Sequence, residues 1–285
     1  MSAFAKRNLK LYLRDKSSVI FSLLAVFIVI ALYVLFLGDV YTNNLKEFEG
    51  AAEMMDNWVM AGVLAITSMT TAFGMLGTMV QDKASGIEKD FYVSPVKRWR
   101  MGAGYMLSAY AVAVVMSLIA LCVAEIYIVV NGGQLMEPEA MIQTVLVILL
   151  TSFMNTSIAL FLTTLFRSIN AYTTANIVLG TLIGFLTGIY LPIGSYPEAV
   201  QWLVKLFPVS HGALIFRNIM MKPVMDNAFE GVPVSVVKEI KEDLGIIYMF
   251  GDKEITVAFS MGIMAAVAVI FFAAACMNLS RKKHS

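Results

Sequence analysis

Six long apolar stretches, separated by shorter polar segments, dominate the hydropathy pattern of the chain. A helix that crosses about 30 Å of hydrocarbon needs roughly 20 apolar residues, and it satisfies its own backbone amides without water. A β-barrel would instead show alternating segments of about ten residues. The pattern therefore predicts an all-α membrane protein, a single transmembrane domain over residues 1–285, with six spans. These spans are Val19–Leu37, Val59–Val80, Gly102–Val130, Met141–Phe166, Ala171–Leu191 and Thr256–Leu279.

The polar segments carry amphipathic patterns of their own. Ala3–Lys16 has apolar residues on one helical face and cations on its flank, which predicts a helix lying on the membrane surface. The alternative is a basic tail that only sets orientation. Gly38–Asn57 is predicted to be an acidic loop. In the long segment Pro192–Ile255, Tyr196–Leu206 and Val234–Leu244 have helical spacing, and we expect the first to re-enter the outer leaflet.

Composition agrees with this pattern. The chain is 59% hydrophobic and 14% charged, with a mean hydropathy of +0.77, whereas soluble domains carry about 25% charged residues. A net charge of +1 gives no reason to expect a nucleic-acid partner. Most Lys and Arg residues lie within residues 1–18, within residues 81–100 or just after the last span. Cytoplasmic flanks are enriched in these residues, so both termini are predicted to face the cytoplasm.

Catalytic motifs are nearly absent from the sequence. The two histidines, His211 and His284, have no metal-ligand partners at useful spacing, and there is no glycine-rich phosphate loop. We therefore expect no enzyme activity, bound metal or cofactor in the chain alone. Cys122 and Cys276 lie inside predicted spans, where buried thiols usually act as small apolar side chains.

Hydroxyl and amide side chains cluster in the second, fourth and fifth spans. Such groups either bond neighbouring helices or line a partly polar substrate path. Glu125, the one ionisable residue inside the predicted spans, is open to two interpretations: a contact with substrate, or an anchor at the outer end of its span. The residues that we assign to the path are Thr67, Thr70, Thr71, Phe73, Asn176, Thr181, Phe185 and Glu125.

Gly180, Gly184 and Gly188 repeat every four residues in the fifth span. This spacing places three bare backbone patches on one face of a helix and lets another helix approach closely. The pattern leaves open whether that partner is another span or a second subunit.

Gln81–Arg100 is the largest predicted cytoplasmic segment between two spans. Positive charges next to the third span, at Lys97, Arg98 and Arg100, suit the anchoring of the chain at lipid headgroups. The glycine, acid and proline earlier in the segment add nothing to such an orientation signal. The first part, Asp82–Pro95, is therefore predicted to be a contact for another protein.

The order of these features resembles the permease subunits of type-2 ATP-binding-cassette (ABC) exporters. Arg7–Leu24 resembles the basic interfacial helix of that family, Gly86–Arg100 its loop before the third span, and Gly188–Gly212 its outer re-entrant helices. The positions that match the family's motifs are Arg14, Asp15, Gly86, Glu88, Ser94, Pro95, Pro208 and His211. Residues 225–256 have no clear counterpart.

The resemblance implies six helices per subunit, two permease copies or paralogues, and two separate ATPase subunits that bind ATP and Mg²⁺. It implies that spans one and five approach the two-fold axis, with Gly180, Gly184 and Gly188 as a subunit contact. It also implies a coupling role for the loop and the N-terminal helix. The residues assigned to ATPase docking and coupling are Asp82, Lys83, Gly86, Glu88, Lys89, Ser94, Pro95, Arg14 and Asp15.

The leading hypothesis is thus a permease that exports an amphipathic or hydrophobic compound, with membrane lipid around it and a partner ATPase below it. A lipid or lipid-linked glycan permease shares this architecture. A membrane sensor or assembly partner that transports nothing is an alternative of another class. An ion-coupled carrier is a further alternative, and it would make Glu125 indispensable.

Overall fold

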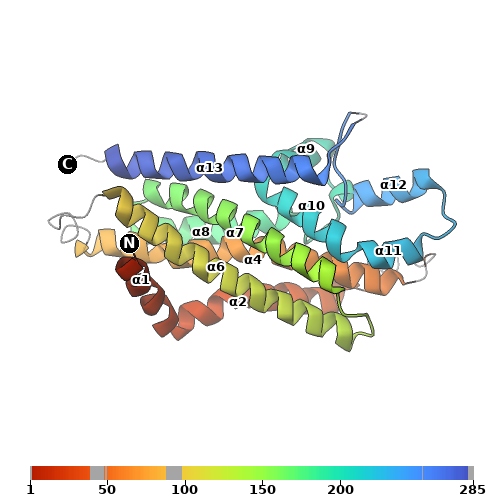
Figure 1. The fold of residues 1–285 in the computed structure, drawn as a ribbon, viewed down its shortest axis with the longest axis horizontal. Helices are drawn as coiled ribbons and strands as arrows, with labels where there is room; N and C mark the ends of the chain where they lie inside the picture. The colour runs from red at the N-terminus through yellow and green to blue at the C-terminus, as the bar shows by residue number, and fades with distance from the viewer. Residues whose placement is uncertain (1, 39–47, 49, 88–97, 252, 282–285) are drawn as a thin grey trace.

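The computed structural model describes residues 2–38, 48, 50–87, 98–251 and 253–281, and they form a bundle of long helices (Figure 1). The long elements are α1 (Ser2–Arg14), α2 (Lys16–Leu32) with the π-helical turn η1 (Tyr33–Leu37), α4 (Ala51–Ala84), α6 (Arg98–Val130), α7 (Pro138–Leu165), α8 (Ile169–Leu186) and α13 (Val257–Arg281). The short elements between α8 and α13 are the 3₁₀ turn η2 (Ile193–Ser195), α9 (Glu198–Leu206), α10 (Pro208–Met220), α11 (Lys222–Ala228), α12 (Val234–Asp243), β1 (Met249–Phe250) and β2 (Lys253–Glu254). The two strands pair as a small antiparallel hairpin.

Five helices of the described chain are long and apolar enough to cross a membrane: α4, α6, α7, α8 and α13. The predicted first span coincides with α2 and η1, of which Val26–Phe36 is recorded as a shorter apolar helix. The pair α9 and α10 would add one more span if both halves crossed together. The helical membrane architecture is therefore confirmed, while the six-span topology and the interfacial position of α1 stay predictions.

Helix α4 occupies the centre of the bundle. The most apolar window of α4 is 89% buried, against 17% for the corresponding windows of α8 and α13. Around α4 pack α2, α6, α7, α8 and α10, and α13 closes the bundle by packing against α7 and α6. Small residues allow these close approaches: a Cβ on Gly62 of α4 would lie 2.8 Å from the side chain of Ile189. A displacement of α4 would therefore change its contacts with five other helices.

The two ends of the bundle differ in content (Figure 1). The start of α1, the end of α4, the start of α6 and the end of α13 lie together, and we call this the α1 end. The short helices α9 to α12 and the hairpin gather at the opposite end, which we call the α10 end.

A sharp bend separates α9 from α10, whose axes differ by 87°. Phe207 between them has an extended backbone, and Pro208 begins α10. A residue before proline is disfavoured in the helical conformation, and proline suits the first position of a helix. The sequence Phe207–Pro208 therefore ends one helix and starts the next.

Several predicted boundaries need correction. Helix α4 begins at Ala51, so the end of the predicted loop Gly38–Asn57 is helical. It continues to Ala84, beyond the predicted end at Val80. Helix α8 ends at Leu186 instead of Leu191. The amphipathic pattern of Val234–Leu244 is confirmed by α12.

Candidate functional site

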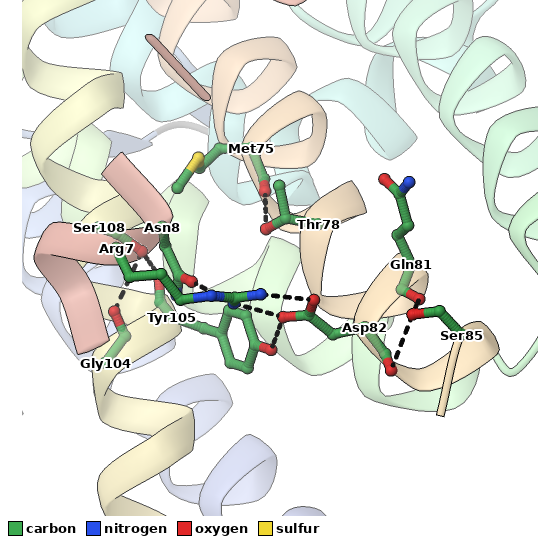
Figure 2. Close-up of polar contacts among 10 residues, drawn as sticks. All are labelled: Arg7, Asn8, Met75, Thr78, Gln81, Asp82, Ser85, Gly104, Tyr105 and Ser108. Atoms are coloured by element: carbon green, nitrogen blue, oxygen red, sulfur yellow. Dashed lines mark hydrogen bonds and ion pairs between the residues drawn. The ribbon is translucent and has the colours of Figure 1, made fainter. Parts of the chain in front are cut away.

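Three side chains from three helices meet at the α1 end (Figure 2). The guanidinium of Arg7, on α1, donates from Nη1 to Oδ2 of Asp82 at 2.7 Å and from Nη2 to Oδ1 at 2.9 Å. The hydroxyl of Tyr105, on α6, donates to the same Oδ2 at 2.6 Å. Paired N–H···O bonds from one guanidinium to one carboxylate give geometric specificity as well as energy. These residues, which we call the Arg7 cluster, join α1, α4 and α6.

The position of Asp82 explains why it needs a cation. Asp82 lies in the last turn of α4, which ends at Ala84. The C-terminal end of a helix carries a partial negative charge, so a carboxylate there is disfavoured unless a positive group compensates. The carboxylate of Asp82 is also buried, at 5% exposure, and a buried charge is costly without a partner. Arg7 supplies the compensating charge from a neighbouring helix.

Packing holds the guanidinium in place. The ring of Phe4 meets Tyr105 edge-on at 4.9 Å, and the guanidinium of Arg7 lies 5.8 Å from the centre of the Phe4 ring. Gly104 gives Phe4 its space, because a Cβ at this position would lie 2.6 Å from the ring. A larger residue at Gly104 would push α1 away from α6.

Arg7 keeps its charge near neutral pH. The hydrogen bond to Asp82 raises the pKa of Arg7 above its already high usual value, and partial burial opposes that effect only in part. Arginine is protonated throughout the physiological range. The guanidinium is therefore a permanent donor to the carboxylate.

An open cavity of about 1060 Å³ adjoins the Arg7 cluster, between α1, α2, α4 and α8. The α4 residues that line it, from Ile66 to Gln81, recur at spacings of three and four and so form one stripe along the helix. Arg7 and Asp82 line the cavity at the α1 end. Its walls are mostly apolar, and the hydroxyl and amide groups between them include those of Thr70, Thr78, Thr173, Asn176 and Thr181.

A bundle of apolar helices with such a cavity is typical of many transporters, and the sequence decides among them. A family model described as ABC-2 family transporter protein matches residues 39–277. The chain belongs to this family. It is accordingly the transmembrane subunit of an ABC transporter, a multi-pass membrane protein, and the family implies association with an ABC ATPase subunit. No curated protein matches the sequence significantly. The predicted resemblance to ABC permeases is thus confirmed.

Two of the coupling residues predicted for this ABC-2 chain occupy unexpected places. Asp82 and Lys83 were assigned to a loop, but both lie in the last turn of α4. The loop assignment is wrong because the helix continues past the apolar stretch once Arg7 and Tyr105 compensate the charge of Asp82. Asp82 points into the bundle, so its side chain binds neighbouring helices instead of presenting a surface to an ATPase.

Three of the other predicted coupling residues follow α4 or lie at the junction of α1 and α2. Gly86 follows α4 with a φ of +77°, a left-handed conformation that glycine adopts readily. Arg14 ends α1, and Asp15 separates α1 from α2 and lines the cavity; both side chains are exposed. Four predicted docking residues lie outside the described residues: Glu88, Lys89, Ser94 and Pro95.

The structure divides the predicted substrate path of the ABC-2 chain. Thr70, Asn176 and Thr181 line the same cavity, although they come from α4 and α8. The remaining α4 residues lie on its other faces and are buried in the bundle: Thr67, Thr71 and Phe73. Adjacent residues such as Thr70 and Thr71 point to different sides of a helix, so a cluster of polar residues in the sequence does not make one polar wall.

Phe185 and Glu125 lie apart from the lining of this cavity. Phe185 is exposed on α8 and packs edge-on against Tyr190 at 5.1 Å. The carboxylate of Glu125 is buried and accepts a hydrogen bond from the backbone N–H of Met136 at 3.0 Å. Glu125 lines a separate cavity of about 360 Å³ that also includes Glu53. This placement favours the anchoring interpretation of Glu125 over a substrate contact.

The three glycines do not form one helical face. Gly180 lines the cavity, and nothing lies within 4 Å of a Cβ built on it. Gly184 accommodates the ring of Tyr190 from its own chain. Gly188 follows the end of α8 and adopts a φ of +65°, so the regular spacing is broken. Of the predicted subunit contact, only Gly180 still offers an open surface.

Two residues with functional potential in this ABC-2 chain are not predicted by the sequence. Tyr105 lies inside an apolar span and carries no signal besides its hydroxyl. Arg217 belongs to α10 and is fully buried, although cations in a polar segment are usually exposed. His211, which matches a family motif, lies on the same helix, is also buried and shares a 3.0 Å hydrogen bond with Ser260 through Nδ1. Each of the three depends on partners far away in the sequence.

Proposed function

We propose that this ABC-2 subunit exports an amphipathic or hydrophobic compound, driven by separate ATPase subunits that dock at the α1 end. The α1 end then faces the cytoplasm and the α10 end faces outward. Excess Lys and Arg in residues 1–18 and 81–100 supports this orientation. A second permease copy is expected to complete the path beside α2 and α8.

The cavity supports the class of substrate. Its apolar walls suit the body of an amphipathic compound, and the hydroxyl and amide groups of Thr70, Asn176 and Thr181 suit a few polar groups on it. Arg7 and Asp82 at its α1 end are already paired with each other. Asp15 is the further acid in the lining and also lies at the α1 end. Along α4 and α8 the lining is uncharged up to that end, which supports a compound of low net charge.

The Arg7 cluster is the single observation that best supports coupling. It connects α1 to the two helix ends that flank residues 88–97, which the family resemblance assigns to ATPase docking. Gln81, the residue before Asp82, belongs to the cavity-lining stripe of α4. A displacement of α1 would therefore reach the cavity wall through one rigid helix.

Co-purification with an ABC ATPase provides the test. The complex should show vanadate-sensitive ATP hydrolysis and should accumulate a fluorescent amphipathic dye in inside-out vesicles when ATP is added. We expect Glu88→Ala or Pro95→Ala to lower ATP-driven uptake about five-fold or more, the scale of typical coupling free energies. Monodisperse elution of each variant checks that the subunit still folds.

Lys238→Ala is the matched control, because this exposed lysine lies on α12 at the opposite end. Its uptake should equal that of the unmodified complex. Uptake that stops when the proton gradient is dissipated, while ATP is present, would support the ion-coupled carrier. A complex that hydrolyses ATP but moves neither dyes nor labelled lipids would support the sensor.

A further inference from the structure

Arg217 is a buried cation without a carboxylate partner among the residues that the structure describes. Its side chain is fully buried in α10, and it forms no ion pair with any described residue. Within the same residues, Nε and Nη1 of Arg217 have no hydrogen-bond acceptor. An apolar side chain of similar volume would avoid the cost of burying this charge. The arginine must therefore make a contact that offsets this cost.

The contact is with the end of α8. Nη2 of Arg217 donates to the carbonyl oxygens of Thr187 at 3.1 Å and Gly188 at 2.9 Å. These two carbonyls follow Leu186, the last residue of α8, near the end where the helix dipole places partial negative charge. Backbone bonds from Gly188 and Ile189 to Phe185 and Gly184, with Gly188 in the left-handed conformation, end the helix. The guanidinium binds the turn that follows.

The same guanidinium also lies against α4. Its central carbon is 4.6 Å from the ring centre of Trp58, which is fully buried. The indole N–H of Trp58 donates to the carbonyl of Leu244, just after α12, at 2.7 Å. Arg217 therefore holds α4, the end of α8 and the segment after α12 together at one point.

The turn that Arg217 grips determines where Tyr190 lies. Gly188 reverses the chain with a φ of +65°, and Ile189 packs against Gly62 of α4. Tyr190 then folds back over Gly184 of α8 and lines the cavity. Tyr190 belongs to the cavity wall only while the turn at Thr187 and Gly188 stays in this place.

We propose that Arg217 is the positioning residue that keeps the cavity closed at the α10 end. Because it holds the turn after α8 against Trp58 and α4, it holds Tyr190 across the end of the cavity. Release of the two carbonyls frees the turn and opens the cavity toward the outside. This inference rests on the proposed function for its orientation, and on contacts within the chain for its geometry.

Accessibility of the cavity from outside tests the proposal. The full chain, in complex with its ATPase, carries Ala in place of Cys122 and Cys276 and Thr181→Cys as a reporter, because Thr181 is exposed and lines the cavity. A membrane-impermeant maleimide is added to right-side-out vesicles without nucleotide. We expect Arg217→Lys and Arg217→Met to raise the labelling rate about ten-fold, which corresponds to roughly 1.4 kcal/mol.

Two controls separate closure from general loosening. Lys222→Met removes an exposed cation at the start of α11 and should leave the labelling rate unchanged. A second reporter, Ser17→Cys, lines the cavity at the α1 end and is labelled from inside-out vesicles. Its rate should not change in the Arg217 variants. A rise at both reporters would mean that the whole bundle has loosened and would overturn the proposal.

Trp58→Phe keeps a ring under the guanidinium but removes the indole N–H, so it serves as a graded variant if Arg217→Met does not fold. It should raise the labelling rate at the Thr181→Cys reporter by a smaller factor.

Unchanged labelling in folded Arg217 variants, judged by monodisperse elution, would refute the positioning role. ATP hydrolysis by the same complex would still support the proposed function. A chain that binds no ABC ATPase would refute that function instead, whatever the labelling rates.

Discussion

The two ends of the bundle use arginine in different ways. At the α1 end, Arg7 is half-buried and pairs with the carboxylate of Asp82, so its charge stays compensated if the two side chains move together. At the α10 end, Arg217 is fully buried and is held by neutral groups, two carbonyls and an aromatic ring. An ion pair with access to water tolerates movement, because solvent can replace lost contacts. A buried cation held by fixed dipoles tolerates very little. The comparison indicates a connection that transmits movement at one end and a connection that resists it at the other.

Removal of the Asp82 carboxylate should lower the free energy of unfolding more than any other change at these two ends. Asp82→Ala deletes the acceptor of three hydrogen bonds and leaves Arg7 without its partner. Breaking a buried pair from one side costs about 3–5 kcal/mol, and the partial exposure of Arg7 places the expected loss at the lower figure. Thermal unfolding in detergent measures it. Lys238→Ala, which truncates an exposed lysine on α12, is the control and should cost far less.

Arginine-to-lysine exchange at both ends should give the next largest effect, and it compares the ends directly. Lysine keeps the charge but loses the planar fork and its stacking on a ring. At Arg217 the loss of a carbonyl contact and of the Trp58 ring should cost about 2 kcal/mol. At Arg7, where lysine can still pair with Asp82, we expect about 1 kcal/mol. Equal costs in chemical unfolding would contradict the distinction between the two ends.

The smallest effect concerns Tyr105. Tyr105→Phe removes one hydrogen bond to Oδ2 of Asp82 and keeps the ring against Phe4. We expect a loss of about 0.5 kcal/mol, the low end for one hydrogen bond, because the carboxylate of Asp82 keeps both bonds from Arg7. Tyr110→Phe, on the same helix, is a control that leaves the cluster intact. A larger loss at Tyr105 than for Asp82→Ala would show that Tyr105, and not the ion pair, holds α1 in place.

The sequence predicted the long helices well because each is an uninterrupted apolar stretch. The predicted ends of α4 are wrong, because the polar residues at both ends of this helix are typical of loops. Asn57 in fact continues the helix and bonds the carbonyl of Glu53 at 2.9 Å, and Asp82 meets a cation 75 positions away in sequence. The periodicity of apolar residues indicates only local structure. It does not show that folding brings Asp82 next to Arg7.

The candidate site was harder to predict for the same reason. Thr70 and Asn176 were assigned to one path and do share a cavity, because both lie on faces that the bundle leaves open. Thr67 and Gly188 were grouped with similar neighbours by type and spacing. Burial of Thr67 and the end of α8 at Leu186 separate them from the groups to which they were assigned. The type of a side chain does not indicate whether other helices cover the helical face on which it lies.

Helix α4 is longer than any membrane requires. Its 34 residues extend about 51 Å at 1.5 Å per residue, whereas hydrocarbon occupies about 30 Å. Such a length lets both ends of α4 extend beyond the hydrocarbon. A rigid tilt of about ten degrees around its midpoint would carry each end roughly 4 Å, in opposite directions. Asp82 lies near one end of α4 and Trp58 near the other, so such a tilt would displace the partner of Arg7 and the aromatic partner of Arg217 together.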